Sequence, residues 1–563
     1  MSSAASAAEW VRVRRYAVPR WMIDEVARCR SAGDWRGACA AAGVDVAFDL
    51  AEVAAEHGVR VAEVLEDDLR HLAPDLIRWH LPRARGGRTT LAPKGIVVLS
   101  GQGSVRGEVH LSGYAAYAAT VRGGRDGPGR RVPVLYLRTP PLADGPQRLT
   151  LCFGTLPSVH VYSLMGAQDW SAARHLWDVR HSDELRERCG GNAARAPFHT
   201  ADGRPEAPPA SDPGTGDPAR HTEWVTHLQD RGDVEAALAA AGIDCARSES
   251  RAVLDGMPLA LSRLVPEMAT LGEQRRYQIP LGRWNYTADN GSALVLDARD
   301  GRLRVELAHL DHRDSVPRLP EACWRRSPDL DLLRSGLLGP EDLHPLVRGA
   351  LFPARRVAAA GPPPPPPVPE PVRIRCDGEW HEASFDGGVL RVPHTETEAE
   401  EKLALHALGG TVTGCFEAWH GWTDGSGRLP RKLRELRRDL LLRVRHGDTP
   451  GLLCLLDAGV SPRLRDARGR TLLHMLNRLD HDVVLPRLLA AGLHLDARDR
   501  RGLSPLHVAI GEHGSLSLVR ALLAAGATMR FDDLENDVIA DYVQCGRPER
   551  DTIWALLFAE AVN

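Results

Sequence analysis

Cys415 and His420 are the residues of this chain whose types and spacing come nearest to nucleophilic chemistry. They lie five positions apart, beside Trp419 and Trp422. A histidine within hydrogen-bond reach of a cysteine can activate the thiol as a nucleophile. The neighbouring tryptophans favour another interpretation, a partly buried cysteine beside an aromatic cluster, and this is the interpretation we prefer.

Other motifs for catalysis or cofactor binding lack the context that they need. Gly101-Gln-Gly103 follows a predicted strand, but the next glycine is Gly107 and no helix follows, so a dinucleotide-binding loop is excluded. The ten cysteines contain no Cys-Xaa-Xaa-Cys pair, and His-Glu-Xaa-Xaa-His does not occur. We therefore predict no catalytic residue, no metal site and no cofactor. We expect the protein not to be an enzyme, and leave residues 1–353 as the region where an activity is still open.

Composition sets further limits on function. Arginine supplies 68 of the 71 basic residues and lysine three, which indicates the codon bias of a high-GC bacterial genome. The formal net charge of −3 does not favour binding to nucleic acid or to an anionic membrane. No apolar run is long enough to suggest a transmembrane helix, and the N-terminus does not resemble a signal peptide. With scattered cysteines that suit a reducing compartment, we predict a cytoplasmic protein that binds no membrane and no nucleic acid.

The C-terminal region contains segments that recur at a fixed spacing. Asp466-Ala-Arg-Gly-Arg-Thr-Leu-Leu-His474 matches Asp499-Arg-Arg-Gly-Leu-Ser-Pro-Leu-His507, and a Leu-Leu-Xaa-Ala-Gly phrase ends at Gly459, Gly492 and, one position later than the strict period, Gly526. The first two of these segments lie 33 residues apart. Residues 431–563 thereby resemble ankyrin repeats, whose period is about 33 residues and whose hallmark is a Thr-Pro-Leu-His-like tetrapeptide. The residues that carry the resemblance are Gly469, Thr471, Leu473, His474, Gly502, Ser504, Pro505, Leu506 and His507.

Each signature residue has a physical role in such a unit. The hydroxyl of Thr471 or Ser504 can cap the first helix, and Pro505 suits the first helical position because its missing N–H would be unpaired there. Gly469 and Gly502 suit turns with positive φ. His474 can bridge neighbouring units through both ring nitrogens, so we assign the repeat histidines a structural role. We expect about four repeats with degenerate terminal ones, an all-α solenoid.

The region before position 358 contains a different repetition. Gly33-Asp34 to Gly43-Val44-Asp45 is echoed further along the chain by Gly232-Asp233 to Gly242-Ile243-Asp244. Each phrase reads as a turn, a short Ala-rich helix and a glycine stop, and each is followed by short apolar runs typical of strands. We predict two tandem related α+β units, residues 1–200 and 221–357, and thus a multidomain α+β protein.

Three further segments complete the organisation. Residues 201–220 are rich in Pro, Gly, Asp and Ser and are predicted to be a disordered linker. Residues 358–371 contain a run of prolines and are predicted to be a stiff polyproline linker. Between that linker and the repeats, residues 372–430 are predicted to form a small α+β module docked on the first repeat.

The resemblance implies that the protein binds another macromolecule. Ankyrin arrays present the turns between repeats and their first helices as a rigid concave surface. On that surface the sequence offers Arg468, Arg470, Arg498, Arg500 and Arg501 as projecting cations, which predicts a protein partner with an acidic surface. We therefore expect a protein–protein interaction or scaffold protein. The alternative is an enzyme or toxin-like effector in residues 1–353, with the array as its targeting module.

Overall fold

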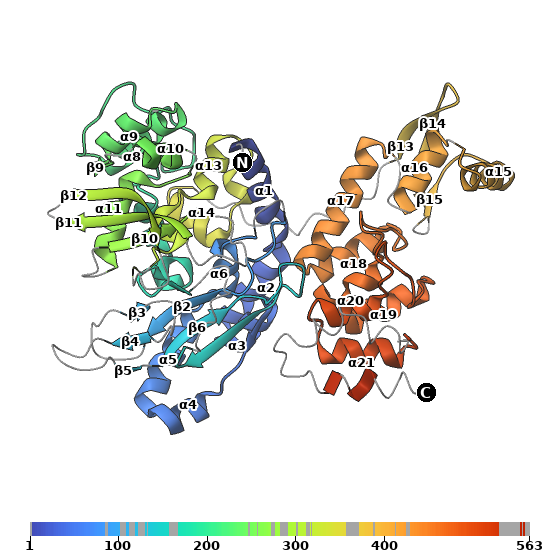
Figure 1. Ribbon diagram of the computed structural model, residues 1–563, viewed down its shortest axis with the longest axis horizontal. Helices are drawn as coiled ribbons and strands as arrows, with labels where there is room; N and C mark the ends of the chain where they lie inside the picture. The colour runs from blue at the N-terminus through green and yellow to red at the C-terminus, as the bar shows by residue number, and fades with distance from the viewer. Residues whose placement is uncertain are drawn as a thin grey trace. The chain divides into compact units, whose positions relative to one another are not determined.

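The protein folds into two compact units, shown in the computed structural model of Figure 1. Unit 1 contains residues 1–143 and 148–359, and unit 2 contains residues 144–147 and 360–563. The structure describes residues 3–84, 88–101, 109–111, 119–121, 130–131, 133–156, 167–245, 248–255, 257–271, 276–281, 291–299, 302–310, 316, 318–355, 371–386, 389–410, 412–423, 428–528, 552–553 and 555–557.

The first half of unit 1 places a run of helices before a mixed sheet. The helices are α1 (Ser3–Tyr16), α2 (Arg20–Ser31), α3 (Trp35–Ala41), α4 (Leu50–His57), α5 (Val59–His71) and α6 (Pro74–His80). The strands are β1 (Val44–Val46), β2 (Ile96–Gly101), β6 (Val134–Arg138), β7 (Leu149–Gly154) and β8 (Ala167–Asp169). Their order is β1-β7-β6-β2-β8, with β1 parallel to β7 and β2 parallel to β8. A small separate sheet contains β3 (Val109–Leu111), β4 (Ala119–Val121) and β5 (Arg130–Arg131).

The second half of unit 1 is built in a similar order. Its helices are α8 (Pro218–Asp230), α9 (Val234–Ala240), α10 (Ser248–Asp255), α11 (Leu261–Thr270), α12 (Glu321–Trp324), α13 (Pro328–Arg334) and α14 (Pro345–Leu351), with the 3₁₀ turn η3 (Pro340–Asp342). Its strands are β9 (Ile243–Asp244), β10 (Arg276–Pro280), β11 (Gly291–Arg299) and β12 (Arg302–Leu310). The sheet order is β10-β11-β12-β9, with β9 parallel to β12 and the other pairs antiparallel. The order β9-β12-β11-β10 therefore repeats the order β1-β7-β6-β2.

The hydrophobic cores of unit 1 do not follow the boundary that the sequence predicts between residues 1–200 and 221–357. Leu330, Leu333, Val347, Leu351 and Phe352 belong to the core of the first half, although they lie within residues 221–357, the second predicted unit. The second core ends at Trp324. The two predicted domains thus share one compact unit, because α13 and α14 bury their apolar faces against the first half.

A buried ion pair accompanies this packing. The guanidinium of Arg14 in α1 donates from Nε to Asp329 Oδ1 of α13 at 2.5 Å, and both side chains are almost fully buried. The indole Nε1–H of Trp79 donates to Asp329 Oδ2 at 3.0 Å. Close by, His344 Nε2 lies 3.0 Å from Asp75 Oδ2. Polar groups far apart in the sequence are satisfied only when the two halves pack together.

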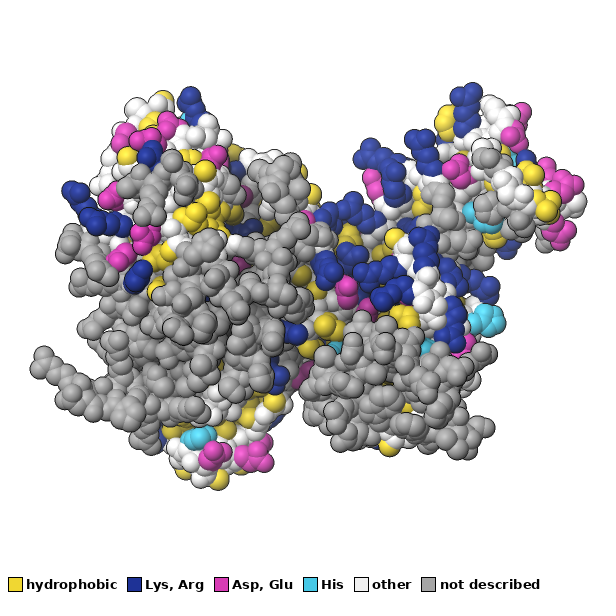
Figure 2. All heavy atoms as spheres, in the orientation of Figure 1, with side chains coloured by type: hydrophobic (Ala, Val, Ile, Leu, Met, Phe, Trp, Pro, Cys, Tyr) yellow, Lys and Arg dark blue, Asp and Glu magenta, His cyan; other side chains and the backbone are white. Residues whose placement is uncertain are grey.

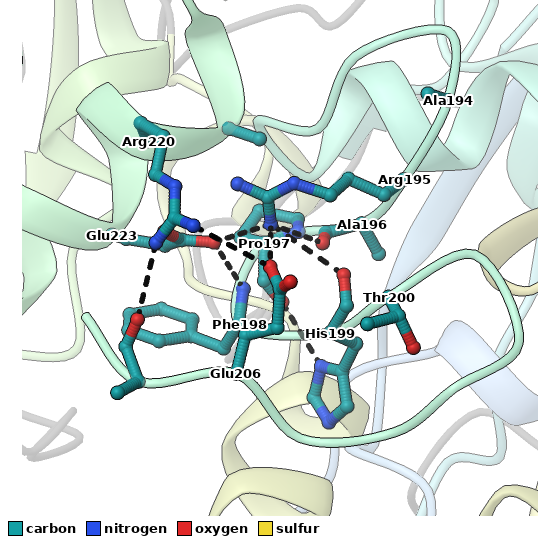
Figure 3. A network of polar contacts seen from close by, with 12 residues as sticks. Ala194, Arg195, Ala196, Pro197, Phe198, His199, Thr200, Glu206, Arg220 and Glu223 are labelled. Carbon is teal, nitrogen blue, oxygen red and sulfur yellow. Dashed lines mark hydrogen bonds and ion pairs between the residues drawn. The ribbon is translucent and has the colours of Figure 1, made fainter. Parts of the chain in front are cut away.

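Residues 201–220, predicted to be a disordered linker, have little regular secondary structure before α8 begins at Pro218, and polar contacts hold their first part in place. Glu223 of α8 is fully buried and accepts hydrogen bonds from Arg195 Nη1 at 2.6 Å and from the Phe198 backbone N–H at 2.7 Å (Figure 3). Arg195 also pairs with Glu206 at 3.2 Å. These contacts anchor the start of the stretch on α8, which itself begins at Pro218.

The segment Trp170 to Arg188 contains two short 3₁₀ turns in place of one continuous helix. They are η1 (Arg174–Leu176) and η2 (Val179–Glu184), followed by one turn of α-helix, α7 (Leu185–Arg188). The buried Asp178 separates the two 3₁₀ turns, accepts the Arg180 backbone N–H at 3.0 Å and pairs with Arg180 at 2.8 Å. The Asp178 carboxylate therefore caps the second turn where a continuous helix would have run.

Unit 2 begins with a three-stranded antiparallel sheet and two helices. They are β13 (Val372–Cys376), β14 (Glu379–Asp386), β15 (Val389–Arg391), α15 (Glu396–Ala407) and α16 (Gly414–Thr423). The sheet and α16 share a hydrophobic core with the repeats that follow. These elements fall within residues 372–430, the range predicted for a small α+β module.

The repeats are consecutive pairs of helical segments (Figure 1, orange to red). They are α17 (Arg431–His446) with α18 (Thr449–Asp457), the 3₁₀ segment η4 (Leu472–Arg478) with α19 (His481–Ala490), and α20 (Pro505–Gly511) with α21 (Leu516–Ala524). Leucines such as Leu455, Leu488 and Leu522 are buried between neighbouring pairs. The predicted helical solenoid is present in these residues.

Some predictions lie outside the described residues. These are nearly all of the polyproline linker at 358–371 and most of the predicted fourth repeat. Ile553 and Leu557, which the structure does describe, are buried in the core of the repeats. Among the described helices, none combines the length and apolar character that a membrane crossing needs.

Candidate partner-binding site

The first helix of the third pair begins as the sequence predicts. Ser504 is the N-cap of α20 and accepts a hydrogen bond from the His507 backbone N–H, with Pro505 in the first turn. The equivalent Thr471 is also the N-cap residue, but the segment that it starts is the 3₁₀ helix η4, and its hydroxyl contacts His474 Nδ1 at 2.8 Å. The difference between the two starts is local and leaves the stacking of the pairs intact.

His474 links two consecutive repeats. Its Nδ1 accepts the Thr471 backbone N–H at 3.1 Å, and its Nε2 lies 3.0 Å from the Leu503 carbonyl of the next repeat. Because Nδ1 is an acceptor, the proton of the neutral ring is on Nε2 and is donated to Leu503. Burial lowers the pKa of His474 to about 4, which keeps the ring neutral. His474 thus connects its own turn with the next repeat through its two ring nitrogens.

The turns between repeats have the same hydrogen bonds at equivalent positions of successive repeats. Asp466 Oδ1 accepts the backbone N–H groups of Arg468 and Arg470, at 2.8 and 2.9 Å. Asp499 Oδ1 accepts those of Arg501 and Leu503, at 2.8 and 3.0 Å. Gly469 and Gly502 have φ values of +77° and +78°, as predicted. The backbone of each turn is therefore held by hydrogen bonds within the turn itself.

Arg470 does not project from its turn, so its assignment as a partner contact needs correction. Its side chain is 6% exposed, donates to Glu512 Oε1 at 2.6 Å and lies 3.4 Å from Asp499 Oδ2. Glu512 also pairs with Arg478 at 3.1 Å. Although burial opposes the charge on Asp499, the backbone N–H groups of Leu503 and Arg501, together with Arg470, lower its pKa. The Arg470 side chain therefore connects neighbouring repeats through ion pairs with the carboxylates of Asp499 and Glu512.

The other four arginines remain at the surface. Arg498 is exposed, but its guanidinium donates to the Gly502 carbonyl at 3.0 Å and so braces its own turn. Arg468 is half-exposed. Arg500 and Arg501 are exposed, and among the described residues their guanidinium groups form no ion pair. Figure 2 shows Lys and Arg side chains gathered over the repeat region. Arg500 and Arg501 are therefore the arginines of the predicted set that are most available to a partner.

The Cys415 and His420 pair has a different setting from the one that the sequence suggested. Both residues lie in α16, and Cys415 is fully buried. Its Sγ lies 3.5 Å from Nδ1 of His381, which is 34 positions away. Burial raises the pKa of Cys415 to about 12. Sequence spacing could not reveal this contact, because the two residues come from a strand and a helix that meet only in the folded module.

Comparison with known proteins identifies the C-terminal region. Residues 440–533 match the family model described as ankyrin repeats, in three copies. This part of the protein is an ankyrin-repeat array, and the predicted resemblance is confirmed. The family match and the three described helix pairs cover the same region.

Two relatives carry the same kind of repeat. NF-kappa-B inhibitor delta of Mus musculus is 26% identical over 198 residues, which are 30% of this chain and 56% of that protein. Rabankyrin-5 of Homo sapiens is 31% identical over 106 residues, which are 17% of this chain and 9% of that protein. The chain thus spans about half of the first relative and under a tenth of the second. The ankyrin region indicates a role in binding another protein.

Proposed function

We propose that the protein is a scaffold that captures an acidic protein partner on the turns of its ankyrin array, chiefly through Arg500 and Arg501. The observation that carries this proposal is their exposure on a turn whose backbone is already fixed by Asp499. A partner that meets a preformed surface loses little conformational entropy of the protein on binding. One relative is named as an inhibitor of NF-kappa-B, which fits an array that acts on another protein.

The chemistry of the proposed contact is electrostatic. Arginine binds carboxylates through two parallel N–H donors, which gives direction as well as attraction. Exposed charges at the rim of an interface mainly raise the association rate, and salt screens them over about 8 Å at physiological ionic strength. The proposal therefore requires that binding weakens as salt increases.

The test is quantitative binding of an identified partner to charge-reversed variants of the full chain. We expect Arg500→Glu with Arg501→Glu to weaken binding by about tenfold or more, mainly through a slower association rate. The matched control reverses Arg60 of α5 and Arg520 of α21, which are also exposed, and changes the net charge by the same amount. Equal affinity of both double variants would remove this surface from the proposal.

We further infer that residues 1–200 and 221–357 are tandem copies of one α+β unit. The supporting observations are the shared strand order and the two Gly-Asp phrases. Asp34 and Asp233 each cap the short helix that follows, accepting the backbone N–H groups of Gly37 and Ala236. An experimental structure in which β9 is not parallel to β12 would contradict this inference.

An enzyme or toxin-like effector within residues 1–353 is the second candidate function. A cavity of about 110 Å³ in unit 1, lined by His80, His175, Cys189 and Cys323 among others, favours it. Nδ1 of His175 is buried and has no hydrogen-bond partner among the described residues. Expression of the full chain would then inhibit growth of the host cell, and His175→Gln would relieve it. No growth effect of the unmodified chain, at a level where it is folded, would count against this candidate.

The cytoplasmic location and the bacterial origin remain predictions. The nine cysteines of the described residues are all free thiols, which supports a reducing compartment.

A further inference from the structure

We propose that Cys376, His381, His394 and Cys415 bind one structural Zn²⁺ ion. Each of the four side chains offers one ligand atom, and these atoms all lie within 4.8 Å of one another. Thiolate and imidazole are the ligands that structural zinc sites use, four at a time and in tetrahedral geometry. The spacing of the residues, Cys-Xaa4-His-Xaa12-His-Xaa20-Cys, matches none of the short paired motifs that sequence reading searches for.

The distances between ligand atoms fit a zinc tetrahedron. Zn–S and Zn–N bonds of about 2.3 and 2.0–2.1 Å give edges of about 3.6 Å between sulfur and nitrogen and about 3.3 Å between two nitrogens. Cys376 Sγ lies 3.6 Å from His394 Nε2, and Cys415 Sγ lies 3.5 Å from His381 Nδ1. The two imidazole nitrogens, His381 Nδ1 and His394 Nε2, are 3.1 Å apart. Three of the six distances between ligand atoms therefore match the edges of a zinc tetrahedron, and the others are no longer than 4.8 Å.

The local fold is built to bring these ligands together. Cys376 ends β13 and His381 lies in β14, and the tight turn between them has positive φ at Asp377 and Gly378. Because His381 is opposite Ile374 in the register, it is on the same face of the hairpin as Cys376. That face carries Val372 and Ile374 into the core, so it is the buried face.

The helix that supplies Cys415 approaches the hairpin very closely. Gly414, directly before Cys415, has a φ of +68°, and a Cβ at this position would lie 2.6 Å from Cys376 Sγ. Only glycine fits both the conformation and the space. Cys376 and Cys415 are 4% and 0% exposed. The two thiols are thus held side by side in the interior.

The outer nitrogen of His394 has the partner that a zinc-bound histidine usually has. His394 turns Nε2 toward the cluster, and its Nδ1 lies 3.5 Å from Oε2 of Glu398, in the first turn of α15. Glu398 is itself held by the backbone N–H and the hydroxyl of Thr395, at 2.8 and 3.0 Å. A carboxylate on the second nitrogen fixes the tautomer and strengthens the imidazole as a ligand.

The module has a physical need for such an ion. It is about 50 residues of sheet and helix that contribute only part of a core shared with the repeats, and metals or disulfides commonly add stability to structures of this size. With four protein ligands the zinc would have no open position, so its role would be structural. Binding releases the two thiol protons to solvent and couples the metal to folding of the hairpin against α16. Because the module shares its core with the array, zinc would stabilise the start of the repeats.

The test is the metal content of the full-length protein, purified under reducing conditions and supplied with Zn²⁺, then dialysed extensively. We expect about one zinc per chain by elemental mass spectrometry. Co²⁺ put in its place should give the absorption spectrum of a tetrahedral site with thiolate ligands. Cys415→Ser should lower the zinc content to about a tenth of the unmodified value or less.

Controls keep the proposal falsifiable if the Cys415 variant does not fold. Cys454→Ser alters an exposed thiol outside the cluster and should keep its zinc. His394→Cys, which keeps a zinc ligand, should also retain the ion, whereas His394→Ala should lose it. The proposal is overturned if the unmodified protein with intact thiols binds no zinc, if Cys454→Ser loses the metal equally, or if Cys376 and Cys415 are found joined as a disulfide under these conditions.

Discussion

Arg470 gives the sharpest test of how the array is held together. Replacing it by methionine keeps much of the side-chain volume but removes the cation from between Asp499 and Glu512, whose side chains are 0% and 13% exposed. Breaking a buried ion pair by removing one partner costs about 3–5 kcal/mol. Glu512 retains Arg478 at 3.1 Å, so we expect the lower end, about 3 kcal/mol.

Hydrogen exchange of the full chain is the suitable assay, because a protein of several units has no single free energy of unfolding. A loss of about 3 kcal/mol in local stability corresponds to about a hundredfold faster exchange of the protected amides in η4 and α20. The matched control is Arg500→Met, which removes an exposed arginine from the next turn and should change stability by less than about 0.5 kcal/mol. If the two variants exchange at similar rates in these peptides, the ion pairs of Arg470 do not stabilise the repeats and our account of the turn is wrong.

Two further predictions concern buried ionisable side chains. Between about pH 6.5 and 4, the stability of η4 and α20 should fall by up to about 3 kcal/mol, because the buried His474 has a pKa of about 4, whereas a histidine of the unfolded chain has a pKa of about 6.5. Hydrogen exchange should show this loss in the unmodified protein and a clearly smaller one in His474→Gln. Parallel pH profiles of the two proteins would contradict the prediction. Asp329→Asn should destabilise unit 1 by about 3 kcal/mol, because it leaves the Arg14 cation buried without a counterion. Faster exchange in α1 would report that loss, while Asp24→Asn, which breaks an exposed pair with Arg20, should have little effect.

The sequence predicted local structure well where one residue type has one physical role. Gly469 and Gly502 take the left-handed turns, Ser504 caps α20, and His474 bridges to the next repeat. The sequence also contains the alternating apolar residues that form β13 (Val372–Cys376), which end at a tight Asp-Gly turn. It failed for Arg470, whose charge suggested exposure, because the two carboxylates that bury it come from residues 29 and 42 positions away.

The sequence by itself determined the ankyrin array and its period, because these depend on residues close together along the chain. Only the tertiary structure decided that α13 and α14 complete the core of the first half of unit 1, and that four ligands spread between Cys376 and Cys415 converge beside Gly414. The physical reason is that burial and ligand geometry depend on which surfaces meet in space. The spacing of residues along the chain predicts such contacts only within one helix, one turn or one repeat.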